Sequence, residues 1–267
     1  MRHPQLIAFL ISIILSLIIP EIALQIIDPL QAKPYFADIW ALFSAAVADD
    51  TRGYVLPAGE YRFSDWTATI LEDHSRYVPD THESDCTITF VGDSVTFGHG
   101  VNDSETWVNL LAQRLPDANL INAGLNGYNG TQALATIREG RASGFFYTLI
   151  SNDADRIKDW QRRPPPAFYE PILPVYLYVL AGMQEPAFLR DYEAFDTALS
   201  SIKEMSTVAI TGFEGDPLAT RAGIDTVPYW THYNSPTDTH ANAAGNSEIA
   251  DAMMPYVASL IENTCPT

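Results

Sequence analysis

The strongest constraint on the fold is an alternation that begins at Cys86, where short β-branched and aromatic runs alternate with segments of helical apolar spacing. The first pattern predicts buried strands, and the second predicts helices. The predicted strands span residues 87–91, 119–122, 145–150 and 207–210, and the predicted helices span 104–115, 131–142, 172–182, 188–205 and 242–261, the last loosely capped by Asn263. Such alternation requires right-handed crossovers and a parallel sheet covered on both faces. We therefore expect an α/β fold, a three-layer α/β/α sandwich around a central parallel sheet.

Length and charge limit what such a chain does. The 267 residues suffice for one sizeable α/β domain, but not comfortably for two. The formal net charge is −18, so the surface repels phosphate backbones, and nucleic acid is not an expected partner. The excess of acidic residues otherwise serves solubility.

An apolar stretch near the N-terminus runs from Leu6 to Ile27 and is interrupted once, by Pro20 and Glu21. Its length is just enough to cross a bilayer as a helix. A cleaved signal peptide would show a similar run, but no small-residue cleavage motif follows at the required distance. We therefore favour a retained single-pass anchor over residues 1–30. It would hold the rest of the chain at the cell membrane, in the periplasm or outside the cell.

Residues 31–85 are expected to connect this anchor to a domain formed by residues 86–267. Within them, residues 36–47 have the pattern of a short amphipathic helix. Residues 54–66 are rich in glycine, proline and aromatic residues, as a short hairpin would be. Neither pattern indicates a function.

Glycines and polar residues directly follow the predicted strands, and a further group precedes the last helix. The stretches are Gly-Asp-Ser-Val-Thr-Phe-Gly at 92–98, Asn-Ala-Gly-Leu-Asn-Gly-Tyr at 122–128, Ser-Asn-Asp at 151–153 and Asp-Thr-His-Ala-Asn-Ala-Ala-Gly at 238–245. In parallel sheets, ligands bind at the carboxyl ends of the strands. Each stretch alone is typical of an ordinary turn, but their order and spacing together indicate an active site.

In these stretches the chain resembles the SGNH, or GDSL-type, serine hydrolases, and most of all their bacterial membrane-anchored members. Those carry a run Gly-Asp-Ser-x-Thr-Phe-Gly-x-Gly-Val-x-Asp followed by Thr-Trp, which is found here at residues 92–107. The resemblance covers residues 90–128 and 238–250 strongly and Asn152-Asp153 less so. It implies a flavodoxin-like sandwich and hydrolysis of carboxylic esters through an acyl-enzyme intermediate, with no metal and no other cofactor.

The resemblance also implies a role for each matched residue. Ser94 is the expected nucleophile, His240 the base that activates it, and Asp238 the acid that orients the imidazole. The expected oxyanion hole consists of the backbone N–H groups of Ser94 and Gly127 and the side-chain amide of Asn152.

Two positions depart from the family pattern. Ile150 stands where many members have glycine, two residues before Asn152. Many members place the triad aspartate three residues before the histidine, and here Thr237 holds that position, so Asp238 is assigned instead.

Two other histidines are candidate site residues. His232 is an alternative base, although nothing around it matches the family. His99 stands in a Gly-His-Gly turn, and we expect it to be an exposed loop residue more than a residue of the substrate cleft.

In this family the last helix packs beside the first strand. Cys86 opens the first predicted strand and Cys265 follows the last predicted helix, so the resemblance allows these two cysteines to meet. We predict a disulfide, which suits an oxidising compartment. Two free thiols are an equally weighted alternative.

The substrate is less constrained than the reaction. The leading expectation is hydrolysis of short acyl esters. The substrate would be a small molecule that carries such an ester, or an O-acetylated glycan. The same triad would also serve an O-acyltransferase acting on a cell-envelope glycan, a lysophospholipase or a thioesterase. A non-catalytic glycan-binding protein is disfavoured, because the site residues are all intact. The oligomeric state is not indicated.

Overall fold

The computed structural model describes residues 3–155, 173 and 190–265. Its centre is a five-stranded parallel sheet in the order β6–β5–β7–β8–β9. The strands are β5 (Thr87–Gly92), β6 (Asn119–Asn122), β7 (Gly144–Thr148), β8 (Val208–Phe213) and β9 (Thr226–Val227). In the register, Phe90 of β5 lies opposite Asn122 of β6 and Phe146 of β7.

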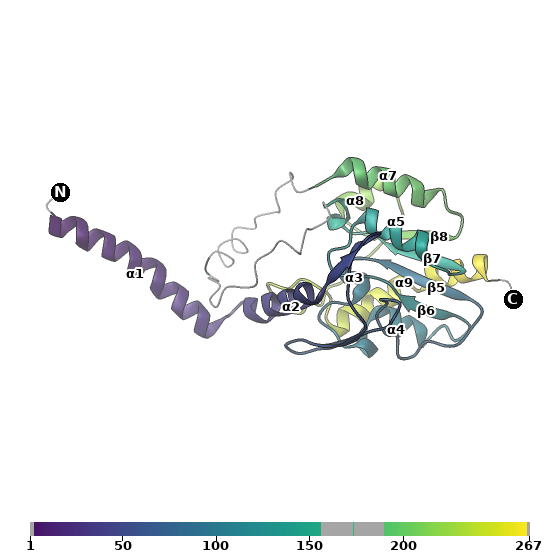
Figure 1. Cartoon of the computed structure of the whole chain (residues 1–267), viewed down its shortest axis with the longest axis horizontal. Helices are drawn as coiled ribbons and strands as arrows, with labels where there is room; N and C mark the ends of the chain where they lie inside the picture. The colour runs from purple at the N-terminus through teal and green to yellow at the C-terminus, as the bar shows by residue number, and fades with distance from the viewer. Residues whose placement is uncertain (1–2, 156–172, 174–189, 266–267) are drawn as a thin grey trace.

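Helices cover both faces of this sheet, which confirms the predicted three-layer α/β/α sandwich (Figure 1). One face packs against α4 (Trp107–Ala112) and α9 (Ala243–Thr264), and the other against α5 (Gly130–Glu139), α7 (Tyr192–Lys203) and α8 (Pro217–Ala222). Phe146 joins the first core and its neighbour Tyr147 the second, because successive side chains of a strand point to opposite faces.

Several predicted boundaries are wrong. The helix predicted over 104–115 is interrupted at Thr106, whose backbone is extended and whose hydroxyl accepts from the Asn109 N–H at 3.2 Å. A short 3-10 turn, η1 (Asp103–Glu105), therefore precedes α4. Asn263 does not cap the last helix, because α9 continues to Thr264. The helix predicted over 172–182 lies outside the described residues apart from one position.

The helix α1 (His3–Ile27) extends away from the body of the molecule (Figure 1). Its segment Ile7–Ile27 has 21 residues and a hydropathy of 2.6, which makes it long and apolar enough to cross a membrane. At 1.5 Å per residue such a helix spans about 32 Å, close to the bilayer's apolar core of about 30 Å. A signal sequence has the same properties, so α1 fits either kind of targeting segment.

Residues 32–70 fold into α2 (Ala32–Ala45) and two hairpins, made of β1 (Val47–Asp49), β2 (Gly53–Val55), β3 (Gly59–Arg62) and β4 (Thr67–Ile70). Leu42 of α2 and Trp66 of the second hairpin are buried in one cluster with Phe97. Phe97 ends α3 (Ser94–Phe97), the short helix after β5. This N-terminal region therefore packs directly onto the carboxyl edge of the sheet.

The predicted disulfide is confirmed. Cys86 is bonded to Cys265, with their Cα atoms 5.4 Å apart. The bond fastens the end of α9 beside the start of β5, at the amino edge of the sheet. Disulfides persist in oxidising compartments, so the bond and the apolar α1 together point to an extracytoplasmic location.

Candidate active site

A sharp turn leads from β5 into α3 and places Ser94 at the first position of that helix. Gly92 has φ +153°, and a Cβ at this position would lie 2.4 Å from the Thr96 Oγ1 atom, so only glycine fits. Asp93 caps α3, because its carboxylate accepts from the Val95 N–H at 2.9 Å. The turn therefore fixes Ser94 at the carboxyl edge of the sheet, where it is buried.

His240 and Asp238 reach Ser94 from the loop before α9. The His240 Nε2 atom lies 2.8 Å from Ser94 Oγ, and its Nδ1 atom lies 2.5 Å from Asp238 Oδ1. Asp238 Oδ1 also accepts from the His240 backbone N–H at 3.1 Å. The three predicted residues thus form one hydrogen-bonded chain from carboxylate through imidazole to hydroxyl, as base-assisted activation of a serine requires.

The second oxygen of Asp238 is held as well. The Asn234 amide donates to Asp238 Oδ2 at 3.0 Å and to the His99 carbonyl at 3.3 Å. Burial alone would raise the pKa of Asp238. The hydrogen bond and charge of His240, with His99 and Asn234, outweigh burial and lower this pKa. The carboxylate therefore stays ionised at neutral pH and can orient His240.

The expectation that His99 is exposed is wrong, since only 2% of its surface is accessible. The hairpin β3–β4 covers it, with the ring centroid of Trp66 5.0 Å from that of His99. The ring centroid of His240 lies 4.6 Å from that of His99. The Asn126 amide nitrogen, a donor, is 2.9 Å from His99 Nδ1. The proton of the neutral ring is then on Nε2, 3.9 Å from Asp238 Oδ2.

His99 is also an uncharged histidine. Burial is the main cause, and with the nearby charges of His240 and Arg76 it outweighs the opposing effect of Asp238 and lowers the pKa of His99 to about 3. The imidazole therefore remains neutral beside His240 across the pH range in which His240 would work as a base.

Asn152 lies in η2 (Ser151–Ala154), the short turn after β7. Its Nδ2 atom donates to Asp93 Oδ2 at 2.9 Å, and the same oxygen lies 3.1 Å from Ser94 Oγ. An amide nitrogen carries two hydrogens, so one is still available for another acceptor. The Asn152 amide is thus held next to Ser94 through a shared carboxylate.

The unusual Ile150 does not disturb this turn. Its backbone N–H donates to the Asp153 carboxylate at 3.0 Å, and the Tyr147 hydroxyl donates to the same carboxylate oxygen at 2.8 Å. Burial and the charge of Asp93 raise the pKa of Asp153 well above its usual value. Asp153 is therefore a buried brace for the turn that carries Asn152.

Gly127 occupies the turn between β6 and α5 with φ +76°, a conformation that favours glycine. The Leu125 N–H donates to the Gly92 carbonyl at 3.1 Å and fastens this turn against the end of β5. Its neighbour Asn126 contacts His99. The turn that carries Gly127 is thus bonded to Gly92 and His99, which lie before and after Ser94 in the sequence.

The alternative base His232 does not join the site. It lies on the surface, where its Nδ1 atom is 2.8 Å from Glu248 Oε1.

Three side chains of the site could in principle hold a metal ion. The ligand atoms of His99, Asp238 and His240 lie within 4.8 Å of one another, and histidine with carboxylate can bind zinc. Both ring nitrogens of His240 are already paired, with Asp238 and with Ser94, so hydrogen bonding accounts for the place of His240 in this cluster.

Sequence reasoning missed three residues around the triad. Asn126 stands directly before Gly127, so the matched stretch contained a signal for it. Asn234 lies four residues before Asp238 in a loop with no matched motif. Tyr35 of α2, whose ring centroid is 6.3 Å from that of His240, has no sequence signal at all.

No family model and no curated protein sequence matches the chain. Solved structures do match it. A member of the lipolytic G-D-S-L family from Veillonella parvula is 14% identical, with a TM-score of 0.41, covering 65% of this chain and 98% of its own. A carbohydrate acetylesterase family member from Sinorhizobium meliloti is 13% identical, with a TM-score of 0.41 and coverages of 66% and 99%. An aryl esterase from M. Smegmatis is 16% identical, with a TM-score of 0.38 and coverages of 66% and 100%. At these identities and TM-scores the similarity is one of fold alone.

Proposed function

We propose that this protein is a serine ester hydrolase that cleaves short acyl esters. Ser94 is the nucleophile, His240 the general base and Asp238 the residue that orients His240. The observation that supports this most is the chain of hydrogen bonds at 2.5 Å and 2.8 Å from Asp238 through His240 to Ser94.

The reaction has two halves. His240 Nε2 takes the proton of the Ser94 hydroxyl as Oγ bonds to the ester carbonyl carbon, and the imidazolium then gives this proton to the departing alcohol oxygen. The bond from the carbonyl carbon to that oxygen breaks, and an acyl-Ser94 ester is left. In the second half, His240 takes a proton from water as the water oxygen bonds to the acyl carbon. The bond from this carbon to Ser94 Oγ then breaks, and the imidazolium returns the proton to Oγ, which releases the acid and restores Ser94.

Negative charge develops on the carbonyl oxygen in both halves. The backbone N–H groups of Ser94 and Gly127 and the second amide hydrogen of Asn152 are the proposed donors to it. Preorganised donors of this kind stabilise the transition state, and losing one costs about 10²–10³ in rate. Asp93 holds Asn152 in place through its 2.9 Å hydrogen bond.

Hydrolysis is favoured over acyl transfer to a sugar. Transfer requires that water be kept from the acyl-enzyme. The His240 side chain is 19% exposed, so water reaches the base that would activate it. A transferase would release more acylated acceptor than free acid when supplied with a sugar alcohol, and the ratio of the two products measures this.

The direct test compares the detergent-solubilised full chain with its Ser94→Ala variant on p-nitrophenyl esters from acetate to longer acyl chains. We expect kcat to fall by at least about 10³-fold in the variant, because the nucleophile is lost. A steep decline with chain length would support a short acyl group, whereas a rise would favour a lysophospholipase or thioesterase.

The matched control is Ser259→Ala, which alters an exposed serine on α9 and should retain wild-type turnover. A fluorophosphonate should label the wild type on Ser94 and leave Ser94→Ala unlabelled, as read by mass spectrometry of peptides. Equal turnover by the wild type and Ser94→Ala would refute the proposed function.

We also propose that residues 1–30 remain as a membrane anchor and that residues 31–85 link it to a hydrolase domain of residues 86–267. The absence of a cleavage motif after the apolar run supports this. The mass of the protein purified from membranes checks it: the intact chain is expected, and loss of the first 20–30 residues would identify a signal peptide.

A further inference from the structure

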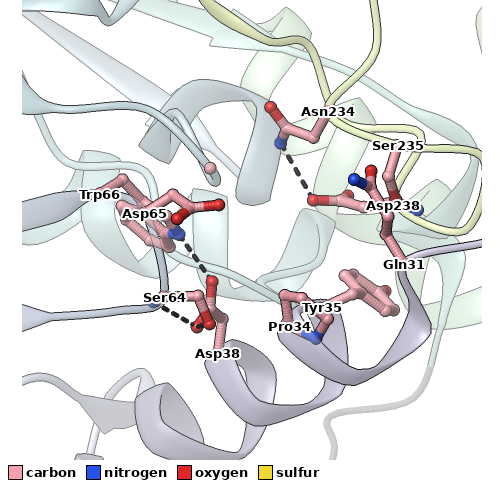
Figure 2. Close-up of a pocket in the computed structure, with 11 residues that line it drawn as sticks. Gln31, Pro34, Tyr35, Asp38, Ser64, Asp65, Trp66, Asn234, Ser235 and Asp238 are labelled. Atoms are coloured by element: carbon pink, nitrogen blue, oxygen red, sulfur yellow. Dashed lines mark hydrogen bonds between the residues drawn. The ribbon is translucent and has the colours of Figure 1, made fainter. Parts of the chain in front are cut away.

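A cleft lies on the Asp238 side of the triad, between α2 and the loop of residues 234–238 (Figure 2). Its volume is about 220 Å³. Pockets for drug-sized ligands measure about 300–1,000 Å³, so this cleft fits one ring-sized group. Its walls include Gln31 and Tyr35 beside or on α2, Asp65 and Trp66 between β3 and β4, and Asn234 and Asp238 of the triad loop.

The position of the cleft matches the alcohol part of an ester. In the proposed reaction the imidazolium of His240 gives its proton to the departing alcohol oxygen, so the alcohol part must lie beside His240. Asp238, bonded to His240, forms one wall of the cleft. Tyr35, with its ring centroid 6.3 Å from that of His240, forms another. Neither Ser94 nor His240 lines the cleft, so a group enters it only if it extends from the reacting carbon past His240.

The lining offers hydrogen bonds at its rim. Among the described residues, the exposed side chains of Gln31 and Asp65 make no hydrogen bond with the protein. Figure 2 places Asp65 across the cleft from Asp238 and Gln31 near the triad loop. A carboxylate accepts from hydroxyls, and an amide both donates and accepts. Together with the aromatic ring of Tyr35, these groups suit a ligand ring that carries several hydroxyls and has an apolar C–H face.

Asp38 has a different task in the same wall. One of its oxygens accepts from the Ser64 backbone N–H at 2.8 Å, and the other accepts from Trp66 Nε1 at 2.9 Å. The residue is buried, and these bonds fix the turn that carries Asp65 (Figure 2). The wall is thus held in place before any ligand arrives.

Other alcohol parts fit this cleft less well. An anionic phosphate headgroup would meet Asp65 and Asp238, and none of the described residues that line the cleft is Lys or Arg. A long alkyl chain would bury the polar groups of Gln31 and Asp65 without partners, which is unfavourable.

We propose that this cleft is the leaving-group subsite and that it binds one sugar residue of an O-acylated glycan. The proposal rests on the proposed ester hydrolysis and names its substrate class. The subsite combines the N-terminal region with the triad loop. The segment that follows α1 would therefore select the substrate, while the sheet edge carries out the chemistry.

The test measures kcat/KM of the detergent-solubilised full chain for glucose 6-acetate and for p-nitrophenyl acetate, which share an acyl group but differ in the alcohol. The readout is the ratio of the two values. In Asp65→Ala the ratio should fall about tenfold or more, because a hydrogen bond to a charged group is lost. In Gln31→Ala it should fall about two- to tenfold.

The control is Asp50→Ala, an exposed aspartate of the same N-terminal region that lies outside the cleft, and its ratio should equal that of the wild type. An unchanged ratio in both cleft variants, or faster cleavage of lysophosphatidylcholine than of the sugar acetate by the wild type, would overturn the subsite while ester hydrolysis stands. If the wild type fails to cleave p-nitrophenyl acetate with dependence on Ser94, the proposed function and the subsite both fall.

Discussion

The carboxyl edge of the sheet and the N-terminal region build one site by different means. The sheet edge holds Ser94 and Asn152 on turns that directly follow β5 and β7, so a few adjacent residues determine their positions. The N-terminal region contributes no member of the triad. It reaches the site through contacts between residues far apart in sequence, such as Trp66 against His99. The chemistry is therefore encoded locally, whereas the enclosure of the site depends on tertiary packing.

One buried side chain joins the two regions. Arg76 is 1% exposed, and its Nε donates to Asp103 at 2.8 Å. Its other nitrogens donate to the carbonyls of Phe97 at 2.8 Å, Gly98 at 2.7 Å, Val101 at 2.6 Å and Thr67 at 3.1 Å. These carbonyls include the end of α3, so Arg76 ties the N-terminal region to the helix that carries Ser94.

The largest expected effect comes from the sheet-edge side of this comparison, in Asp238→Asn. An amide at this position can donate to His240 Nδ1 and stabilise the tautomer that cannot accept the Ser94 proton. We expect kcat for p-nitrophenyl acetate to fall about 10⁴-fold. Asp50→Asn is the matched control and should keep wild-type kcat. A loss below tenfold would remove Asp238 from the proposed triad.

The second prediction tests the joint between the regions. Replacing Arg76 with methionine leaves several buried carbonyls and Asp103 without their donor, so we expect the free energy of unfolding to fall by about 3–5 kcal/mol. Urea unfolding followed by tryptophan fluorescence measures it. Arg62→Met is the control, because Arg62 is 80% exposed and should change stability by less than about 0.5 kcal/mol. Equal midpoints for both variants would show that Arg76 does not hold the regions together.

The disulfide offers a contrast within the sheet itself. It lies at the amino edge, opposite the edge that carries Ser94. Replacing both Cys86 and Cys265 with alanine should lower the free energy of unfolding by about 2–4 kcal/mol, since the unfolded chain loses a constraint. We expect kcat at 25 °C to stay within twofold of wild type, because changes at sites far from each other are largely independent. A large drop in kcat with unchanged stability would contradict this separation.

The same contrast explains what the sequence could predict. The motifs after the predicted strands and before the last helix predicted that Ser94, Asn152, Asp238 and His240 lie together, because each depends on its own turn or loop. The pattern could not locate the contacts of the N-terminal region. Its strands have only three or four residues, and Arg76 donates to three carbonyls that lie more than twenty residues away.

His99 is the clearest failure of local reasoning. A Gly-His-Gly turn is typical of an exposed loop, and the prediction followed that rule. Trp66 from the second hairpin buries this turn, and the residues next to His99 in the sequence do not predict this contact. The helix predicted over 104–115 failed for a local reason instead, because Thr106 leaves the helical conformation to cap α4.

The smallest expected effect concerns the place where the two regions meet around His99. Its pKa falls from the ordinary 6.5 to about 3 on folding. Below pH 6.5 the unfolded chain therefore binds a proton that the folded chain does not. The contribution of His99 to the free energy of unfolding should then decline as pH falls from about 6.5 toward 4, by up to about 1.4 kcal/mol per pH unit. The raised pKa of Asp153 contributes with the opposite sign, so the His99 contribution is measured as a difference from a variant that lacks this imidazole. Asp238 adds a decline of the same sign only at lower pH, because its pKa lies below 3.8.

Urea unfolding of the wild type and His99→Gln at several pH values between 4 and 7 measures this slope. Glutamine can keep the contact with Asn126 but cannot take up a proton, so the free energy of unfolding of the wild type should decline relative to that of the variant as pH falls through this window. His82→Gln is the control, since His82 is exposed and has no hydrogen bond or ion pair among the described residues, and its slope should match that of the wild type. Identical slopes for the wild type and His99→Gln would mean that the N-terminal region does not exclude water from His99. Packing between the two regions would then not control the environment of the triad.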